Sequence, residues 1–194
     1  MSESELEMQS DAVELKEERR GMVPWVKLLA WGLVLGLLAV VAVQLVATQE
    51  GNVGPGEAAP NFVLSTFEGQ EINAADMQGK VIVLNFWASW CKPCEQEAAD
   101  LQTAWEMYAP RGDILFLGVD YVDTQSEARK YLQRFEITYP NGPDLGTRIS
   151  QAFRIRGVPE TYFIDQQGNL AYVKIGPFTS LAEITNIIDG LLDS

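Results

Sequence analysis

The stretch NFWASWCKPCEQE, residues 85–97, contains both cysteines of this 194-residue chain. Cys91 and Cys94 stand between an apolar, β-branched run and a segment with helical spacing. A C-x-x-C pair in this setting is a redox centre, half of a metal site, a haem attachment site or a coincidence. The rest of the sequence separates these four interpretations.

Composition argues against several of them. The chain has 14 basic and 27 acidic residues, a net charge of −13 and no histidine, so neither a nucleic-acid partner nor a histidine-ligated metal is expected. Two cysteines alone make a poor zinc site, because structural zinc takes four nitrogen or sulfur ligands. Covalent haem attachment requires a histidine after the second cysteine, where this chain has Glu95. The redox interpretation remains, and we expect neither a metal nor a cofactor.

The position of the pair predicts a separate role for each cysteine. Residues 81–87 read as a buried strand, and a helix is predicted to begin at about Cys91. Unpaired N–H groups at a helix N-terminus stabilise a thiolate, so Cys91 is the expected nucleophile, with the Lys92 ammonium favouring its thiolate. Cys94 lies one turn further on the same face, where it is placed to resolve a mixed disulfide. The alternative, a static structural disulfide, would gain little chain entropy from closing so short a loop.

Residues 28–47 (LLAWGLVLGLLAVVAVQLVA) contain one polar side chain, Gln44. A helix of this length spans roughly 30 Å, the hydrocarbon thickness of a bilayer. The segment exceeds the apolar core of most cleaved signal peptides and no A-x-A-like site follows it, so we expect an uncleaved signal anchor rather than a core helix. The basic residues before it are Lys16, Arg19, Arg20 and Lys27, and the next is Lys80. This asymmetry predicts a cytoplasmic N-terminus and an external C-terminal part.

The chain is therefore expected to divide into four segments. Residues 1–22 are an acidic cytoplasmic tail, predicted to be disordered, and residues 23–48 contain the anchor. Residues 49–59 (QEGNVGPGEAA) are predicted to be a flexible tether. Residues 60–194 have the length of one domain with one core.

Strand and helix patterns alternate within this domain. The predicted strands are 61–67, 81–87, 114–119, 161–164 and 170–175, and the predicted helices are 91–108, 124–135 and 179–192. The order is β-α-β-α-β-β-α after one or two extra strands at the N-terminus of the domain. This predicts an α/β fold in which helices flank a mixed central sheet.

Two stretches also resemble a known family. APNFVLSTFEGQEI…GKVIVLNFWASWCKPCEQE, from Ala59 to Glu97, is similar to the opening of the membrane-tethered thiol–disulfide oxidoreductases of the ResA, TlpA and CcmG/DsbE group. FRIRGVPETYFIDQQGNLAYVKIGP, residues 153–177, is similar to their second half, and its Gly-Val-Pro-Glu-Thr most resembles the cytochrome c maturation reductases. The resemblance covers nearly all of residues 58–194. It implies a thioredoxin-like (redoxin, AhpC/TSA-type) fold behind one N-terminal transmembrane helix, and a redox-active Cys91–Cys94 disulfide.

The resemblance also implies roles for residues around the pair. Pro159 is expected to be cis and to face the cysteines, and Val158 before it to pair through its backbone with an extended substrate. Trp90 is expected to be partly a packing residue and partly a substrate platform. Trp87 is expected to lie in the core.

Two acidic residues each have two possible interpretations. Glu97 matches a family residue that tunes the pair and moves protons, while a solvated glutamate in the first helical turn is the alternative. Glu160 matches the acidic residue after the cis proline, which keeps the site acidic, and simple surface exposure is the alternative. Asn85 stands where cytoplasmic thioredoxins have a buried aspartate, so Glu97 or solvent would have to accept protons in its place.

The leading hypothesis is a thiol:disulfide oxidoreductase anchored in the bacterial cytoplasmic membrane by a single helix, with its domain on the outer face. It would reduce a disulfide-containing protein, with apocytochrome c as the expected substrate, and draw electrons from a polytopic membrane thiol carrier. A general extracytoplasmic reductase with spore-coat or oxidase-assembly targets is the first alternative. A copper chaperone is a further alternative, but it normally adds a histidine ligand and this chain has no histidine. A peroxiredoxin is disfavoured, because its peroxide-reducing cysteine lacks this C-x-x-C partner. A binding module with an inert disulfide is a further alternative.

Overall fold

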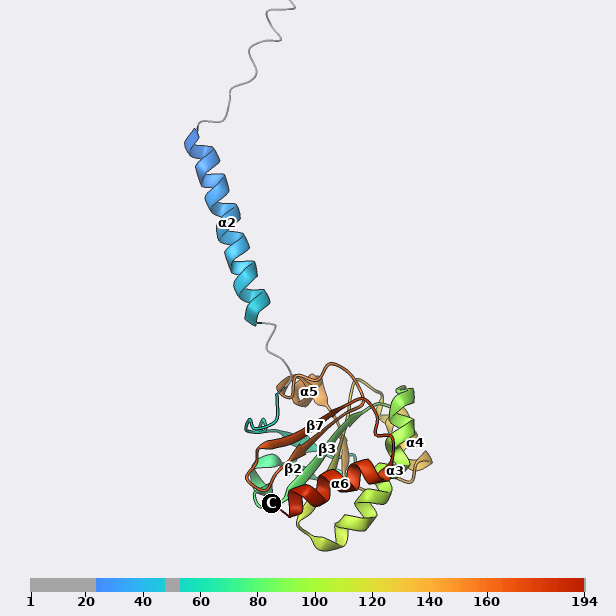
Figure 1. Cartoon of the computed structure of the whole chain (residues 1–194). Helices are drawn as coiled ribbons and strands as arrows, with labels where there is room; N and C mark the ends of the chain where they lie inside the picture. The colour runs from blue at the N-terminus through green and yellow to red at the C-terminus, as the bar shows by residue number, and fades with distance from the viewer. Residues whose placement is uncertain (1–23, 48–52, 194) are drawn as a thin grey trace, which may run out of the picture. The chain divides into compact units, whose positions relative to one another are not determined.

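The computed structural model describes residues 24–47 and 53–193, which belong to two separate units, a lone helix and a domain (Figure 1). Helix α2, Pro24–Ala47, contains the predicted anchor. Its Trp25–Val43 segment has a mean hydropathy of 2.4 and none of it is buried. By length and composition α2 is therefore able to cross a membrane. The predicted acidic tail, residues 1–22, lies outside the described residues.

Residues 53–59 were predicted to be part of the flexible tether, and the structure holds them against the domain. Val53 is buried in the core, 8% exposed. The Gly56 N–H donates to the Leu170 carbonyl at 2.7 Å, and the Leu170 N–H donates to the Glu57 carbonyl at 2.8 Å. The prediction of flexibility therefore does not hold for residues 53–59, because their backbone pairs with the edge of the sheet despite its glycine-rich composition.

The central sheet of the domain is mixed, as predicted, with the strand order β5-β4-β3-β6-β7. Its strands are β3 (Val81–Trp87), β4 (Ile114–Asp120), β5 (Asn141–Pro143), β6 (Glu160–Ile164) and β7 (Leu170–Ile175). β4 pairs in parallel with β3 and β5, whereas β6 is antiparallel to both β3 and β7. All residues of the central strand β3 are buried, which explains its continuous apolar sequence. A separate hairpin comprises β1 (Val63–Ser65) and β2 (Glu71–Asn73).

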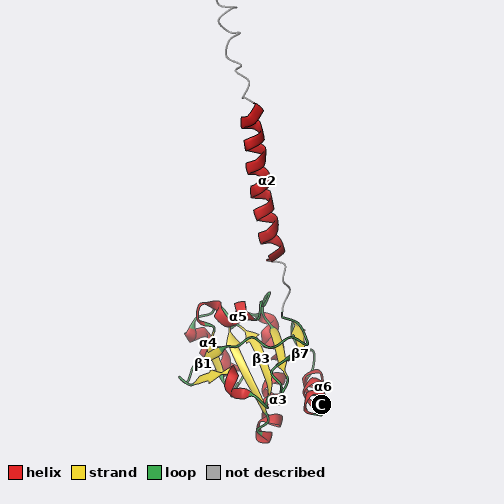
Figure 2. Ribbon diagram, turned by 90° about the vertical axis from the view of Figure 1, so that its left-hand side faces the viewer, coloured by secondary structure: helices red, strands yellow, loops and turns green. Residues whose placement is uncertain are grey.

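Four helices belong to the domain: α3 (Lys92–Tyr108), α4 (Gln125–Arg134), α5 (Arg148–Ala152) and α6 (Leu181–Leu192). Short 3-10 turns lie at Ala74–Met77, Ala109–Arg111 and Leu145–Thr147. The helices α4 and α6 begin one and two residues after the predicted starts, because Thr124 and Ser180 act as N-caps whose hydroxyls accept backbone N–H groups. α3 and α6 lie side by side against the sheet (Figures 1 and 2).

The core lies on both faces of the sheet. Alternate residues of β3 point to opposite faces, so Val83 packs against α3 and α6 while Leu84 and Phe86 pack on the other side. A third cluster at the carboxyl end of β3 includes Trp87 and both cysteines. All three clusters consist of residues between 53 and 192.

Three elements had no range predicted from the sequence: β2, β5 and α5. β5 consists of Asn-Gly-Pro, three residues typical of turns, and becomes a strand only because β4 supplies its ladder partners. α5 has five residues, too few for periodicity to reveal, and Asp144 supports it by accepting the N–H groups of Ile149 and Ser150.

Candidate active site

The cysteines lie where β3 passes into α3. Cys91 is the N-cap residue of α3, and its Sγ accepts the Cys94 N–H at 3.1 Å. A disulfide joins the two residues, whose Cα atoms are 5.3 Å apart, and both are buried. The N-terminus of the helix therefore directs the Cys94 N–H at Cys91 Sγ, an arrangement that stabilises a thiolate when the disulfide is reduced.

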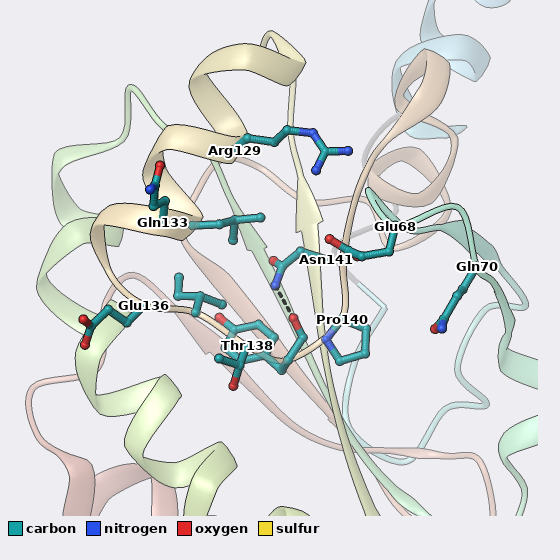
Figure 3. A pocket seen from close by; sticks show the side chains of 11 residues that line it. Glu68, Gln70, Arg129, Gln133, Glu136, Thr138, Pro140 and Asn141 are labelled. Carbon is teal, nitrogen blue, oxygen red and sulfur yellow. Dashed lines mark hydrogen bonds between the residues drawn. The ribbon is translucent and has the colours of Figure 1, made fainter.

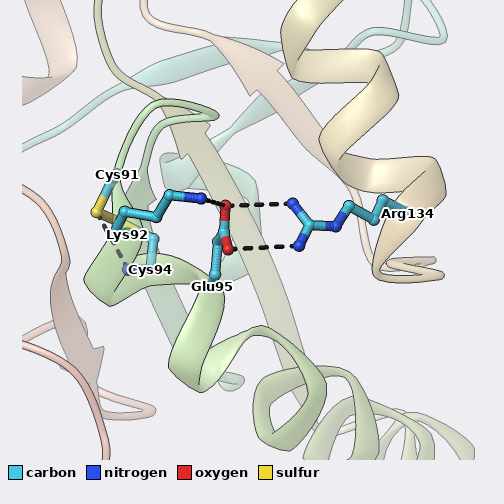
Figure 4. A network of polar contacts seen from close by, with 5 residues as sticks. All are labelled: Cys91, Lys92, Cys94, Glu95 and Arg134. Atoms are coloured by element: carbon cyan, nitrogen blue, oxygen red, sulfur yellow. Dashed lines mark hydrogen bonds and ion pairs between the residues drawn. A yellow bond between two sulfur atoms is a disulfide. The ribbon is translucent and has the colours of Figure 1, made fainter.

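A small ion-pair network lies beside the disulfide (Figure 4). The Lys92 ammonium is 2.9 Å from Glu95 Oε1, and the same carboxylate is 3.2 Å from the Arg134 guanidinium of α4. The hydrogen bond from Lys92 is the main reason that the pKa of Glu95 lies below its usual value. Lys92 was expected to favour the Cys91 thiolate, but it is engaged with Glu95, which reduces that influence.

Glu97 is a buried carboxyl one helical turn after Cys94, and it is only 1% exposed. The alternative of a solvated glutamate is therefore wrong. Its Oε1 accepts Asn85 Nδ2 at 2.9 Å, and its Oε2 accepts the Phe178 N–H at 2.9 Å. Asn85 also donates to the Thr161 hydroxyl oxygen at 2.9 Å. Asn85, Glu97, Thr161 and the Phe178 N–H are referred to below as the buried polar group.

Burial raises the pKa of Glu97 to about 7, although the hydrogen bonds from Phe178 and Asn85 act in the opposite direction. A carboxyl group with this pKa both accepts and releases a proton near neutral pH, as an acid–base catalyst must. The position of Glu97, three residues after Cys94, was enough to match it to the family residue. It did not reveal the burial, since the partners of Glu97 come from β3 and from the segment before α6.

The Val158–Pro159 peptide bond is cis, as the resemblance implies. Pro159 is buried and its carbonyl accepts the Gly176 N–H at 2.9 Å. Val158 is half-buried and packs against the cluster that contains Cys91. The chain thus brings Val158 and the cysteine pair into one region of the domain.

Glu160 is also buried, 1% exposed, so the alternative of simple surface exposure is wrong. Its Oε1 accepts the backbone N–H of Arg156 at 2.8 Å and that of Gly157 at 3.3 Å. Its Oε2 accepts the Tyr162 hydroxyl at 2.8 Å. Glu160 therefore fixes the backbone that leads into the cis proline.

An exposed edge borders the disulfide. Trp90 and Val122 are 58% and 59% exposed. The indole N–H of Trp90 donates to the Val122 carbonyl. The Ser89 N–H donates to Asp123 Oδ2 at 2.6 Å. Ser89, Trp90, Val122 and Asp123 are called the rim below. Trp87, in contrast, is buried and stacked on an α4 tyrosine, in agreement with its expected core position.

Asp120, the last residue of β4, was not among the residues predicted from the sequence. It is 2% exposed, and burial, followed by the neighbouring Asp123, raises its pKa to about 7. The available signal was an aspartate at the end of the apolar run ILFLGVD, where a strand normally meets solvent.

A groove of about 720 Å³ lies between α4, the loop after it and the turn between β1 and β2 (Figure 3). Its lining includes Glu68, Arg129, Gln133 and Asn141. None of the predicted site residues lines it, and neither cysteine is among its lining residues.

Comparison with known proteins agrees with this geometry. Residues 55–173 match the AhpC/TSA family. The thiol-disulfide oxidoreductase ResA of Geobacillus thermodenitrificans (strain NG80-2) is 33% identical over 132 residues, which are 68% of this chain and 75% of that protein. The chain belongs to the AhpC/TSA family and, within it, to the ResA-type thiol-disulfide oxidoreductases. The predicted resemblance is confirmed.

Solved structures of other proteins have a similar fold. A thiol:disulfide interchange protein of the thioredoxin family from Chlorobium tepidum TLS is 28% identical, with a TM-score of 0.65 over 73% of this chain and 99% of that one. StoA from Bacillus subtilis, 22% identical, has a TM-score of 0.59 over 67% of this chain and 96% of that one, and shows the fold alone. This ResA-type chain is therefore a thioredoxin-like enzyme that exchanges thiols and disulfides.

Proposed function

We propose that this ResA-type oxidoreductase is a membrane-anchored reductase of protein disulfides outside the cytoplasm, and that its substrate is apocytochrome c before haem attachment. The observation that carries the proposal is the Cys91–Cys94 disulfide at the N-terminus of α3, with an exposed tryptophan on one side and the cis proline loop nearby. The likeness of Gly-Val-Pro-Glu-Thr, residues 157–161, to the maturation reductases supports the choice of substrate. Haem thioether bonds form at free cysteines, which an oxidising compartment would otherwise hold as a disulfide.

The reaction begins from the reduced dithiol form. The Cys91 thiolate attacks one sulfur of the substrate disulfide, the substrate S–S bond breaks, and one substrate thiolate leaves. Cys94 then loses its proton and attacks Cys91 Sγ. The mixed disulfide breaks, the second substrate thiolate leaves, and the enzyme holds the Cys91–Cys94 disulfide. Two electrons have passed to the substrate, and a membrane dithiol carrier restores the enzyme by the reverse exchange.

Glu97 is the proposed proton acceptor for Cys94. It lies one turn further along α3, and its pKa of about 7 suits proton transfer at neutral pH. Asn85 holds the carboxylate in place with a neutral donor. The buried aspartate of cytoplasmic thioredoxins is thus replaced in function by a glutamate on the helix.

Substrate docking is assigned to the rim and to the segment before Pro159. Val158 has no backbone–backbone hydrogen bond within the described part of the chain, so its N–H and carbonyl are offered to an extended peptide. Trp90 supplies an exposed aromatic face beside Cys91. The buried Glu160 carboxyl group holds this segment in position by accepting the N–H groups of Arg156 and Gly157.

Helix α2 is the proposed anchor, with its N-terminus in the cytoplasm. Its length and uniformly apolar sequence support a single membrane crossing, and the basic residues before it support the orientation. Tethering would keep the domain close to a polytopic membrane thiol carrier that supplies electrons. The oxidising exterior makes such a dedicated supply necessary.

The test is a trapping experiment with the domain, residues 49–194, carrying Cys94→Ala. Without Cys94 the mixed disulfide at Cys91 is not resolved and accumulates. We expect membrane extracts to yield apocytochrome c, or a peptide from it that contains C-x-x-C-H, joined to Cys91. The matched control, Cys91→Ala, retains the buried Cys94 and should trap far less.

Each outcome discriminates between the alternatives. Capture of many unrelated proteins would replace the cytochrome substrate with a general reductase role. Absence of any adduct, together with an unreactive Cys91 at neutral pH, would contradict the reductase mechanism. In intact cells, a membrane-impermeant thiol reagent should label Cys91 of the full-length Cys94→Ala variant, and failure to label it would contradict the external location.

A further inference from the structure

Asp120 and Asp123 form an unusual pair directly behind the rim. Asp120 is the register partner of Trp87 at the carboxyl end of the sheet, and it is 2% exposed. Within the described residues its Oδ1 has no hydrogen-bond partner. The nearby Asp123 carboxyl raises the pKa of Asp120, both by its charge and by a hydrogen bond between the two side chains. Two carboxyl groups share a hydrogen bond only if one of them carries a proton.

The surrounding contacts locate that proton. Asp123 accepts the Ser89 N–H on Oδ2 at 2.6 Å and the Thr124 N–H on Oδ1 at 2.7 Å, so both of its oxygens already accept a backbone donor. Asp120 is more deeply buried and receives no N–H donor on Oδ1. Its neutral form is therefore the one that fits, with its O–H donating to Asp123.

Asp123 connects this pair to the rim. Its bond to Ser89 holds the loop that carries Trp90, and Trp90 in turn donates to the Val122 carbonyl at 3.1 Å. Val122 has a φ of 46°, in the left-handed region that β-branched residues avoid. The conformation of the rim thus depends on the hydrogen bonds from Ser89 to Asp123 and from Trp90 to Val122.

The charged groups of the neighbouring elements do not compensate Asp120. On α4, Arg129 donates to the Phe67 carbonyl, Lys130 pairs with Glu127, and Arg134 pairs with Glu95. On the side of β5, the Asp144 carboxylate is occupied by the N–H groups that begin α5. Asp123 is therefore the charged group that acts on Asp120, and it acts by repulsion when both are ionised.

We propose that Asp120 and Asp123 share one proton that holds the rim beside Cys91, and that ionisation of the pair releases the rim. This inference rests on the proposed function, since the rim is where the protein substrate is proposed to dock. The raised pKa of Asp120, about 7, places the change near neutral pH. Above it, two adjacent carboxylates repel each other, and Asp123, on the less buried loop, moves and gives up the Ser89 N–H. Both aspartates are positioning residues and touch no reacting atom.

The test follows the Ser89 amide in the full-length, oxidised chain in detergent micelles, labelled with ¹⁵N at serine, between about pH 5 and about pH 9. We expect its chemical shift to titrate with a midpoint near 7. Asp120→Asn should abolish this titration, because the introduced side-chain amide does not ionise and donates to Asp123 at every pH. Asp123→Asn, a change on the more exposed partner, should also abolish it.

Glu97 has a pKa in the same range, so Glu97→Gln is the control and should leave the Ser89 titration unchanged. A Ser89 amide that does not titrate in the wild-type chain would overturn the proposal. So would a titration that persists in both aspartate variants or disappears in Glu97→Gln.

A kinetic experiment tests the consequence for docking. For a disulfide-containing peptide derived from a cytochrome, the KM of the wild-type chain should rise about fivefold from pH 6 to pH 8 relative to the KM of Asp120→Asn. With a small disulfide such as cystamine, the rates of the two proteins should show no such difference. Equal KM profiles in the two proteins would contradict the docking role. The amide titration needs no substrate, so it stands or fails independently of the proposed function.

Discussion

Two carboxyl groups of this domain have the same raised pKa, about 7, for different reasons. Glu97, in the buried polar group, has a neutral donor on each oxygen, and burial is the main reason that its pKa is raised. Asp120, behind the rim, has one oxygen without a partner and a second carboxylate as its neighbour. A raised pKa thus suits Glu97 to proton transfer, whereas at Asp120 it supports the contact with Asp123 behind the rim. What differs is whether the ionised form is accommodated by the surroundings.

Linkage predicts the stability that each group contributes. Both carboxyls bind their proton more tightly in the folded chain than in the unfolded one, where pKa values are about 4. The folded state is therefore favoured most below about pH 4, and this contribution is lost as the pH rises to about 7, the folded pKa. The predictions below test whether the two sites differ as described.

The largest effect is expected for Asp120→Asn. This change removes the buried charge at alkaline pH and supplies a permanent donor to Asp123. It should raise the free energy of unfolding of the domain at pH 8 by up to about 4 kcal/mol, with little gain at pH 4, at ~1.4 kcal/mol per unit of pKa shift. Urea unfolding at both pH values measures this. An equal effect at both would show that Asp120 is not protonated in the folded state.

Asn85→Asp would make Glu97 resemble Asp120. It replaces the neutral donor of Glu97 with a second carboxyl, so the two groups would repel each other when ionised. We expect a loss of about 3 kcal/mol of unfolding free energy at pH 8 and much less at pH 5. Thr161→Val is the matched control, since it removes a hydrogen bond of Asn85 without adding charge and should cost about 1 kcal/mol at either pH.

Glu97→Gln tests proton transfer. Gln keeps the size of the side chain but accepts no proton, so the resolving attack by Cys94 should slow by about 10- to 100-fold at pH 7. Single-turnover release of substrate thiol from a mixed disulfide at Cys91 measures this step. Asp100→Asn, one turn further along α3, is the control and should leave the rate unchanged. A rate for Glu97→Gln within twofold of wild type would assign the proton to solvent.

The smallest effect concerns Lys174, which forms an ion pair with Glu183 and lowers the pKa of Glu97 at a distance. Lys174→Gln should raise the pKa of Glu97 by less than about one unit, because the pair is partly exposed. The double change Lys174→Gln, Glu183→Gln should bring it back, since Glu183 acts in the opposite direction. Carboxyl ¹³C titration of Glu97 distinguishes these cases, and a lower pKa in the single variant would contradict the assignment.

The sequence predicted the strands and helices that have a clear period and a clear boundary. The apolar run of β3 and the caps of α4 and α6 are local signals, so their positions agree with the structure within two residues. β5 and α5 were missed, because three turn residues and one helical turn carry no periodicity of their own. The tether prediction failed at residues 53–59 for a related reason, since a glycine-rich composition says nothing about the sheet edge on which it packs.

The candidate site divides in the same way. By itself the sequence determined the cysteine pair, the helix that begins beside it and the family to which both belong, because each of these is recognised from continuous stretches of sequence. Only the tertiary structure decided that Glu97 meets Asn85 and the Phe178 N–H, and that Asp120 lies against Asp123 behind Ser89. Burial and pKa are set by neighbours from distant parts of the chain, and a one-dimensional pattern does not contain them.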